Sequence, residues 1–177
     1  HISEFVDNPS FDFVEDDLVY CDEFGDTLDG VDMVWHLAAK TDIKFGDNYD
    51  FDADYDQNLD ATYLLLRGMK DRKINRLAFS SSAAVYGSRS ILDEEMLPEP
   101  ISMYGATKLA CEALIRAMAL RCGMQSWMFR YCSIVSGKAR KSGNMVIPDL
   151  IHKLQKDPTR LEILGDGKQT KPSLLVS

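Results

Sequence analysis

The sequence predicts an α/β fold built on a parallel sheet. Apolar runs typical of strands alternate with segments whose apolar residues recur at helical spacing. These strand-like runs are apolar throughout, which is typical of parallel strands covered on both faces. The chain has 177 residues, 45% of them hydrophobic, so it is long enough to bury a core. We therefore expect one central sheet with helices on both faces.

The first part of the chain contains two predicted strands and one predicted helix. Phe11–Val14 predicts a short strand, and Val31–Leu37 predicts a second one that ends in two alanines. The helix is predicted between residues 52 and 70, where apolar or small residues recur every three or four positions: Tyr55, Leu59, Thr62, Tyr63, Leu66 and Met69.

The middle of the chain repeats this order. Arg76–Phe79 predicts a buried strand that runs into three serines, Ser80–Ser82. A proline-containing loop then precedes a helix predicted at 104–122, which Gly123 would end in a left-handed conformation. Ser126–Tyr131 predicts the next strand.

The composition of the sequence changes after Gly137. A basic loop is followed by a predicted helix at 145–156, a predicted strand at Leu161–Leu164 and a tight turn at Gly165–Gly167. We therefore predict two regions, one at 1–137 that contains the sheet and one at 138–177.

Four alternating aspartates between residues 50 and 56 invite comparison with a calcium loop. An EF-hand loop that began at Asp50 would need glycine at position 55 and glutamate at position 61, where Tyr55 and Ala61 stand. We interpret the aspartates as a solvated helix start, where the helix dipole favours carboxylates. We predict no metal site.

Composition excludes several classes of protein. The net charge of −8 argues against a protein that binds a nucleic-acid backbone. We see no secretion leader and no apolar stretch near the roughly 20 residues that span a bilayer, so we expect a cytoplasmic protein without a membrane partner. The cysteines form no C-x-x-C pair, and we predict reduced thiols for Cys21, Cys111, Cys122 and Cys132.

Three predicted strands end in segments that would meet at one edge of the sheet. These are Ala38–Ala39, Ser80–Ser82 and the residues after Tyr131. Parallel sheets of this type bind ligands at the carboxyl ends of their strands. Tyr104 and Lys108 stand at i and i+4 at the start of a predicted helix, so their side chains point the same way.

Two segments, Ser80–Gly87 and Tyr104–Lys108, resemble the catalytic serine, tyrosine and lysine of the short-chain dehydrogenase/reductase family. The resemblance runs from about Asp17 to Val176. It is closest to the extended branch, the NAD-dependent nucleotide-sugar epimerases and dehydratases, and within it to archaeal-type UDP-glucose 4-epimerases. The other matching segments are Trp35–Ala39, Asn58, Leu109–Glu112, Arg130–Tyr131, Val146–Ile147 and Leu161–Gln169.

This resemblance implies a Rossmann-like, doubly wound parallel sheet with part of a small C-terminal substrate-binding region. It also implies an isomerase that uses NAD to epimerise a nucleotide-sugar at C4, through transient hydride transfer and a 4-keto intermediate. UDP-glucose and UDP-galactose are the expected pair. Tyr104 would be the general base, with its phenolate favoured by Lys108, and Ser82 would hydrogen-bond the reacting hydroxyl.

The resemblance also assigns binding residues. The implied contacts with NAD are Asp17, Leu18, Leu37, Ala38, Ala39, Ser80, Tyr104, Lys108 and Tyr131. The implied contacts with the nucleotide-sugar are Ser82, Ser133, Val146, Ile147, Leu161, Ile163 and Lys171. Asn58 would tie neighbouring strand backbones together. A homodimer is expected through helices near 54–69 and 105–121.

Several departures from the family pattern limit these implications. The sequence has no G-x-x-G-x-x-G turn, so we expect an incomplete dinucleotide-binding domain that lacks the N-terminal glycine-rich segment and the C-terminal end. Ser133 stands where epimerases usually carry asparagine, and Lys171 where arginine is common. Ala83 and Ala84 replace the acidic pair of dehydratases and cannot transfer protons, which disfavours dehydration.

Alternatives stay open at this point. The same scaffold serves nucleotide-sugar reductases, C5 or C6 epimerases and decarboxylases, and a truncated, catalytically silent member of the family is a further reading. Arg130 could be a structural ion-pair partner or a ligand contact. His36 ends a predicted strand, and we interpret it as a core residue.

Overall fold

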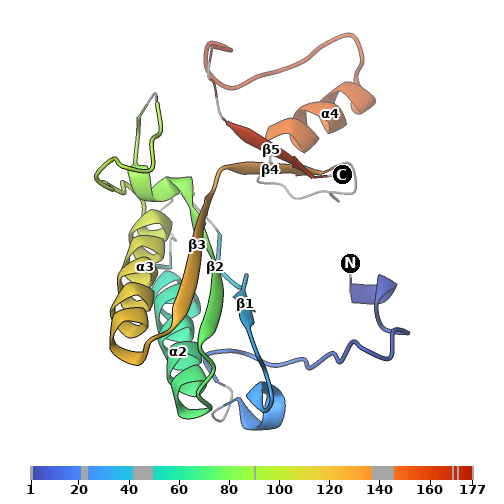
Figure 1. Ribbon diagram of the computed structural model, residues 1–177. Helices are drawn as coiled ribbons and strands as arrows, with labels where there is room; N and C mark the ends of the chain where they lie inside the picture. The colour runs from blue at the N-terminus through green and yellow to red at the C-terminus, as the bar shows by residue number, and fades with distance from the viewer. Residues whose placement is uncertain are drawn as a thin grey trace.

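The computed structural model describes residues 2–20, 24–41, 50–89, 91–136, 146–168, 170 and 172–176. Its centre is a parallel sheet of three strands in the order β1-β2-β3 (Figure 1). The strands are β1 (Val34–His36), β2 (Arg76–Ser82) and β3 (Gln125–Tyr131). The strands predicted at 31–37, 76–79 and 126–131 are confirmed, although β1 is shorter than the segment predicted for it.

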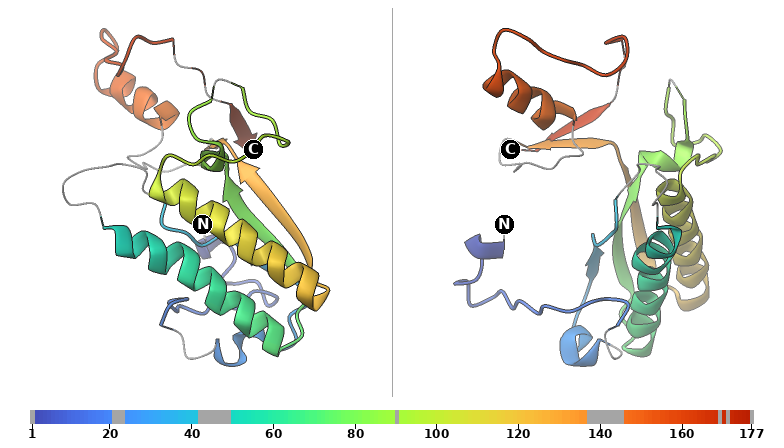
Figure 2. Two further views of the ribbon diagram at one scale, coloured as in Figure 1. Left: turned by 90° about the vertical axis from the view of Figure 1, so that its left-hand side faces the viewer. Right: turned by 180° about the vertical axis from the view of Figure 1, so that it is seen from behind.

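One face of this sheet is covered by helices (Figure 2). A helix begins as α1 (Phe51–Asp54), passes through a π-helical segment η3 (Tyr55–Asp60) and continues as α2 (Ala61–Asp71). The second helix is α3 (Met103–Cys122). The core between sheet and helices includes Leu65, Leu66, Met69, Leu77, Phe79, Cys111 and Ile115.

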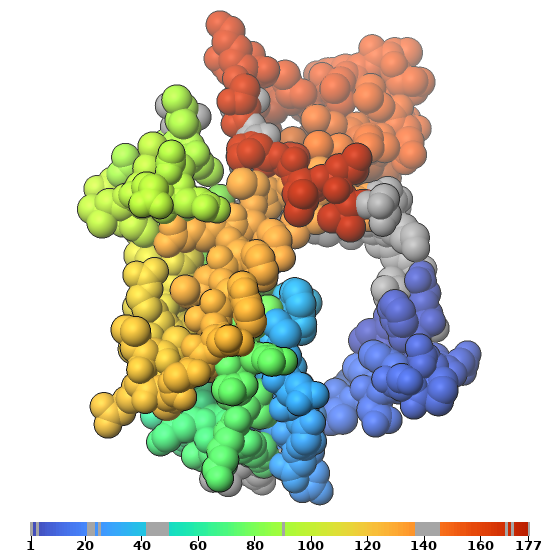
Figure 3. Space-filling view, in the orientation of Figure 1, coloured from blue at the N-terminus to red at the C-terminus, as the bar shows by residue number. Residues whose placement is uncertain are grey.

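The other face of the sheet carries exposed aromatic rings. Trp35 and Trp127 flank Ala78 in one row, and their exposed fractions are 60% and 43%. The Phe129 side chain is 39% exposed, and its ring stacks on Trp35 at a centroid distance of 6.5 Å. Among the described residues, helices therefore cover one face, where we expected cover on both. Figure 3 shows a hollow between the central body and the N-terminal segment, which is drawn in blue.

The boundaries of α3 follow from its sequence. The Ser102 hydroxyl caps its start by accepting a hydrogen bond from the Gly105 amide at 3.1 Å. Gly123 ends it in the left-handed conformation, with a φ of 66°, as predicted. Short 3₁₀ turns complete the first half of the chain: η1 (Ile2–Glu4), η2 (Gly25–Leu28) and η4 (Ala83–Tyr86).

A second, smaller sheet stands beyond the carboxyl ends of the central strands. It pairs β4 (Ser133–Ser136) with β5 (Ser173–Val176) in parallel, and α4 (Val146–Lys156) accompanies it (Figure 1). The helix was predicted, whereas the two strands were not. The boundary proposed at 137/138 stays a prediction, since β4 precedes it and pairs with β5 beyond it.

Two predicted strands are wrong. Phe11–Val14 and Leu161–Leu164 are irregular, because neither finds a neighbouring strand to complete its backbone hydrogen bonds. The turn predicted after the second segment is confirmed by positive φ values of 83° at Gly165 and 74° at Gly167. Within the described residues, no helix combines the length and apolar character needed to cross a membrane.

Candidate active site

Tyr104 and Lys108 lie on one face of α3, against the carboxyl end of β2. Both side chains are buried, and they follow one another by one helical turn. The Lys108 ammonium donates a hydrogen bond of 2.7 Å to the Ser80 carbonyl. Ser82 stands two residues further along β2, and its side chain lowers the pKa of the Tyr104 hydroxyl. The structure thus brings the predicted serine, tyrosine and lysine together at the end of the strand.

Close backbone packing holds this arrangement. Ser82 ends β2, and its hydroxyl accepts a hydrogen bond of 3.2 Å from the Ala84 amide at the start of η4. The first turn of α3 then approaches η4 very closely at Gly105. A Cβ at this position would lie 2.6 Å from the Ala84 carbonyl oxygen. Glycine is therefore required for Tyr104 to sit this close to Ser82.

Burial has the largest effect on the pKa of Tyr104. Burial raises the pKa of its hydroxyl, and the hydrogen bond with Ser82 offsets part of that rise. The Lys108 ammonium stands 5.9 Å from the tyrosine ring centroid. Burial therefore favours the neutral phenol, and the role of Tyr104 as a base activated by Lys108 stays a prediction.

Lys108 is itself perturbed by its surroundings. Burial lowers the pKa of its ammonium to about 8. The charge stands over the Phe79 ring, 4.5 Å from its centroid. The ammonium is therefore charged at neutral pH, and it begins to lose its proton under mildly alkaline conditions.

His36 belongs to the core, as interpreted from the sequence. Its Nε2 lies 2.9 Å from the Thr62 hydroxyl, and its ring packs on Phe79 at a centroid distance of 5.4 Å. Burial, with a smaller contribution from the charge of Lys108, lowers the pKa of His36 to about 4. The imidazole is consequently neutral at neutral pH.

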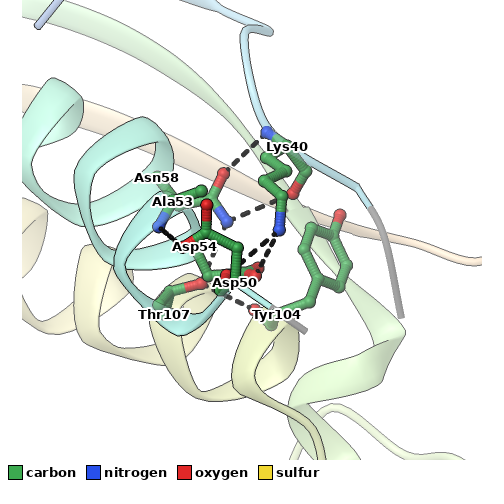
Figure 4. A network of polar contacts seen from close by, with 7 residues as sticks. All are labelled: Lys40, Asp50, Ala53, Asp54, Asn58, Tyr104 and Thr107. Carbon is green, nitrogen blue, oxygen red and sulfur yellow. Dashed lines mark hydrogen bonds and ion pairs between the residues drawn. The ribbon is translucent and has the colours of Figure 1, made fainter. Parts of the chain in front are cut away.

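Asn58 links the segment after β1 to α3 (Figure 4). Its side-chain oxygen accepts a bond of 2.9 Å from the Lys40 amide, and its amide nitrogen donates to the Lys40 carbonyl at 3.2 Å. The same nitrogen donates to the Thr107 hydroxyl at 3.2 Å. Asn58 therefore joins the backbone at Lys40, after β1, to Thr107 on α3. We had expected it to join the backbones of two strands.

The aspartate-rich start of α1 is only partly solvated, contrary to our interpretation. Asp50 caps the helix by accepting a bond of 3.0 Å from the Ala53 amide. Asp54, however, is fully buried and forms an ion pair of 2.7 Å with Lys40 (Figure 4). No pattern in the sequence indicated this pair, because its partners lie on different elements. Within the described part of the chain, no cluster of three His, Cys, Asp or Glu could hold a metal ion.

Four further predicted cofactor residues lie at the same edge of the sheet. Leu37 directly follows β1 and is exposed, and Ala38 and Ala39 come next. Tyr131 ends β3 in register with Ser82, and its ring stacks on Phe129 at a centroid distance of 5.8 Å. These positions surround the carboxyl ends of the three strands.

Asp17 and Leu18 are not brought to this edge. Their segment, drawn in blue in Figure 1, passes the lower end of the sheet, opposite the carboxyl ends of the strands. Leu18 packs against the hydrophobic core. The Asp17 carboxylate accepts a hydrogen bond of 2.9 Å from the Val19 amide.

The predicted substrate residues, apart from Ser82, fall on the C-terminal unit around β4, β5 and α4. Ser133 begins β4, and Val146 and Ile147 begin α4. The segment that contains Leu161 and Ile163 is tied to α4 by a bond of 3.2 Å from the Lys153 ammonium to the Glu162 carbonyl. All five side chains are exposed. Lys171 lies outside the described residues.

Sequence reasoning assigned no role to Glu112, although its segment matched the family. Glu112 forms an ion pair of 2.7 Å with Arg130. Arg130 therefore forms an ion pair, which is one of the two roles left open for it in the sequence. The spacing of Tyr104, Lys108 and Glu112, four residues apart along α3, was the signal that could have found it.

A family model and curated relatives match nearly the whole chain. The family model described as "NAD dependent epimerase/dehydratase family" matches residues 4–177. A protein described as an uncharacterized UDP-glucose epimerase, YtcB of Bacillus subtilis, is 27% identical over 100% of this chain and 55% of its own length. A putative UDP-glucose 4-epimerase of Methanocaldococcus jannaschii is 30% identical over 96% of this chain and 56% of its own.

Solved structures show the same relationship. The UDP-glucuronic acid 4-epimerase from Bacillus cereus, in complex with UDP-glucuronic acid and NAD, has a TM-score of 0.86 and 30% identity. The match covers 98% of this chain and 55% of that one. A UDP-galactose 4-epimerase has a TM-score of 0.78 and 31% identity, over 97% and 55% of the two chains. The chain thus spans about half the length of these relatives and has their Rossmann-like α/β fold, and it belongs to the NAD-dependent epimerase/dehydratase family.

Proposed function

We propose that the chain carries the catalytic centre of a nucleotide-sugar 4-epimerase that uses NAD. The observation that carries this proposal is the meeting of Ser82, Tyr104 and Lys108 at the carboxyl end of β2. UDP-glucose and UDP-galactose are the proposed substrate pair, as the names of several relatives suggest. Ala83 and Ala84 support epimerisation over dehydration, because methyl groups cannot transfer protons.

The residues present fit one end of NAD. Lys108, the Ser80 carbonyl and the exposed Leu37 stand around the strand ends, where the ribose and nicotinamide would lie. When bound, NAD would supply a reversible acceptor for the hydride at C4 of the sugar. The sequence contains no glycine-rich turn for the pyrophosphate, and Asp17 and Leu18 lie at the other end of the sheet. We therefore assign residues to the nicotinamide end alone.

Tyr104 and Ser82 would handle the proton of the sugar 4-hydroxyl. Tyr104 takes the proton of the sugar 4-hydroxyl, and Ser82 hydrogen-bonds the same oxygen and orients it. Because burial raises the pKa of Tyr104, the base needs positive charge nearby to form a phenolate. Lys108 supplies the protein's share of that charge at neutral pH.

The nucleotide would lie on the C-terminal unit. Val146, Ile147, Leu161 and Ile163 offer exposed apolar side chains that could flank a uracil ring. Ser133 and Lys171 are proposed for the diphosphate, and a lysine there would act as a point charge without the fork geometry of arginine. This unit stands above the carboxyl ends of the central strands, on the side where the sugar would have to enter (Figure 1).

A homodimer in the cytoplasm is part of the same proposal. The outer faces of α2 and α3 expose Tyr63 and Leu120, apolar groups that a second copy could cover. Cys111, Cys122 and Cys132 are free, as expected for a protein kept in a reducing compartment.

Calorimetric titration of NAD⁺ into the 177-residue chain, with and without UDP-glucose, tests the proposal. We expect micromolar binding of NAD⁺ and interconversion of UDP-glucose and UDP-galactose. Tyr104→Phe should abolish turnover while NAD⁺ still binds. Tyr63→Phe, an exposed tyrosine on α2, is the matched control and should change neither. Absence of NAD⁺ binding would contradict the proposal for this chain and favour a catalytically silent family member.

A further inference from the structure

A buried ion pair joins α3 to the edge strand β3. The Arg130 Nη2 donates to Glu112 Oε2 at 2.7 Å, and the Arg130 Nε donates to Oε1 at 3.0 Å. The two side chains keep only 19% and 4% of their exposure, respectively. The hydrogen bonds with Glu112 raise the pKa of Arg130 above its already high ordinary value, so the pair stays charged.

Two further contacts extend this pair to the neighbouring elements. The buried Ser81 hydroxyl on β2 donates to Glu112 Oε1 at 2.5 Å. The Arg130 Nη1 donates to the Tyr86 hydroxyl in η4 at 2.7 Å, and the guanidinium lies 4.9 Å from the centre of that ring. One carboxylate and one guanidinium therefore connect β2, β3, α3 and the turn that follows Ser82.

Glu112 continues the row of active-site residues on α3. Tyr104, Lys108 and Glu112 follow at intervals of four and share one face of the helix. Each of them faces a different one of the last three residues of β2. Lys108 donates to the Ser80 carbonyl, Glu112 accepts from Ser81, and Ser82 lowers the pKa of Tyr104. Movement of α3 along or around its axis would break all three contacts.

Of the three contacts, the one made by Glu112 tolerates the least displacement of α3. A buried carboxylate is costly unless its oxygens keep their hydrogen bonds, so Glu112 tolerates little displacement from Ser81 and Arg130. The Lys108 ammonium has three donors and a flexible stem, and Tyr104 has a single hydroxyl that can turn about its bond to the ring. Glu112 is thus the contact that fixes the register between helix and strand.

We propose that Glu112, held by Arg130, is a positioning residue that fixes α3 against β2 and so sets the spacing of Ser82, Tyr104 and Lys108. It bonds none of these three side chains, and its effect on the reaction is indirect. The catalytic meaning of this role rests on the proposed epimerase function. The geometric claim can be tested without cofactor or substrate.

The test is to measure the pKa of the Lys108 ammonium. NMR titration of the chain labelled with ¹³Cε-lysine gives this pKa, and the signal that disappears in Lys108→Met identifies Lys108. Burial lowers this pKa to about 8 in the wild type. The groups that face the ammonium are His36 on β1, Phe79 on β2, and Tyr104 and Cys111 on α3. In Glu112→Ala, displacement of α3 should let water reach the ammonium. The pKa should then rise by one unit or more toward the ordinary value of about 10.4.

Two matched variants separate positioning from general weakening. Ile115→Ala removes a fully buried side chain from the same helix one turn further on, and the Lys108 pKa should stay near the wild-type value. Glu112→Gln keeps the shape of the side chain but replaces one acceptor oxygen by a donor amide, so it loses part of the bonding to Ser81 and Arg130 and should give a smaller rise than Glu112→Ala. Ser81→Ala removes only the hydroxyl and should give a smaller rise, which provides a second reading if Glu112→Ala does not fold.

The outcomes distinguish this inference from the proposed function. An unchanged Lys108 pKa in folded Glu112→Ala, or an equal rise in Ile115→Ala, would overturn the positioning role. A selective rise in a chain that shows no epimerase activity would support positioning and count against the function. In an active chain, Glu112→Ala should lower kcat by about 10- to 100-fold with KM nearly unchanged, because misplaced catalytic groups slow the reaction step.

Discussion

The two faces of the central sheet differ sharply although the same three strands supply both. Toward α2 and α3, Leu77 and Phe79 have no exposed surface. On the opposite face Trp35, Trp127 and Phe129 stay open, with two of the rings stacked on one another. The active-site residues of α3 gather on the covered side and at the strand ends. Close packing on one face can therefore hold the site in place, while the open face contributes little to it.

The largest expected effect comes from a matched pair of phenylalanines, one for each face. Phe79→Ala should lower the free energy of unfolding by about 3–5 kcal/mol, because it empties a fully buried position. Phe129→Ala should cost no more than about 1 kcal/mol, since that ring is already partly in water. Urea unfolding of both variants measures the difference. Equal losses would show that the open face is covered in solution.

The second effect uses pH to probe the covered face. The unfolded chain protonates His36 below pH 6.5, whereas the folded chain resists protonation until about pH 4. Unfolding therefore takes up protons in this window, and stability falls as the pH falls. Between pH 7 and pH 5, His36 alone should cost about 2 kcal/mol. Urea unfolding at both pH values should show this loss in the wild type.

Two histidine variants make this prediction specific. His36→Gln keeps a hydrogen-bonding group near Thr62 and should remove most of the acid sensitivity. His152→Gln, at an exposed position on α4, should leave that sensitivity intact. Acid sensitivity that is the same in all three proteins would mean that His36 does not remain neutral in the folded state.

The third effect concerns the approach of α3 to η4. Gly105→Ala places a Cβ 2.6 Å from the Ala84 carbonyl oxygen, so the helix start must move. We expect a loss of about 1–3 kcal/mol in the free energy of unfolding, and displacement of Tyr104 away from Ser82. Gly123→Ala meets no atom within 4 Å and suffers only the strain of its positive φ, about 1 kcal/mol. Only the first variant should alter the NMR titration of Tyr104, and a change in both would contradict a local role for Gly105.

The elements that could be predicted from the sequence are those with local signals. The helix of Tyr104 has a serine cap, a glycine stop and apolar residues throughout, and its bounds agreed with the structure within one residue. Phe11–Val14 has a strand-like composition but no partner strand, and pairing is decided by the fold as a whole. β4 and β5 were missed for the converse reason, since each gains its strand character from the other across the intervening chain.

The same distinction applies to the site. Ser82, Tyr104 and Lys108 could be found because motif and strand-end position coincide in the sequence. The spacing along α3 places Glu112 on the same helix face. The pairing of the buried charges could not be predicted, because Lys40 meets Asp54, and Glu112 meets Arg130, only after distant elements pack together. The pKa of Tyr104 also depends on burial, which no spacing in the sequence records.

The smallest effect on stability should come from substitutions on the open face of the sheet. Their main consequence should be a change in the association between molecules. Trp35 and Phe129 present stacked rings to solvent, and such a surface promotes contact between molecules. Replacing both by serine should change the free energy of unfolding by about 1 kcal/mol or less, because little buried surface is lost. Sedimentation velocity should nevertheless show less self-association than in the wild type.

Leu120→Ser, on the outer face of α3, is the control for association through the helices. If Leu120→Ser alone reduces association, the helix face is the contact between copies and the exposed rings of the sheet stay in water.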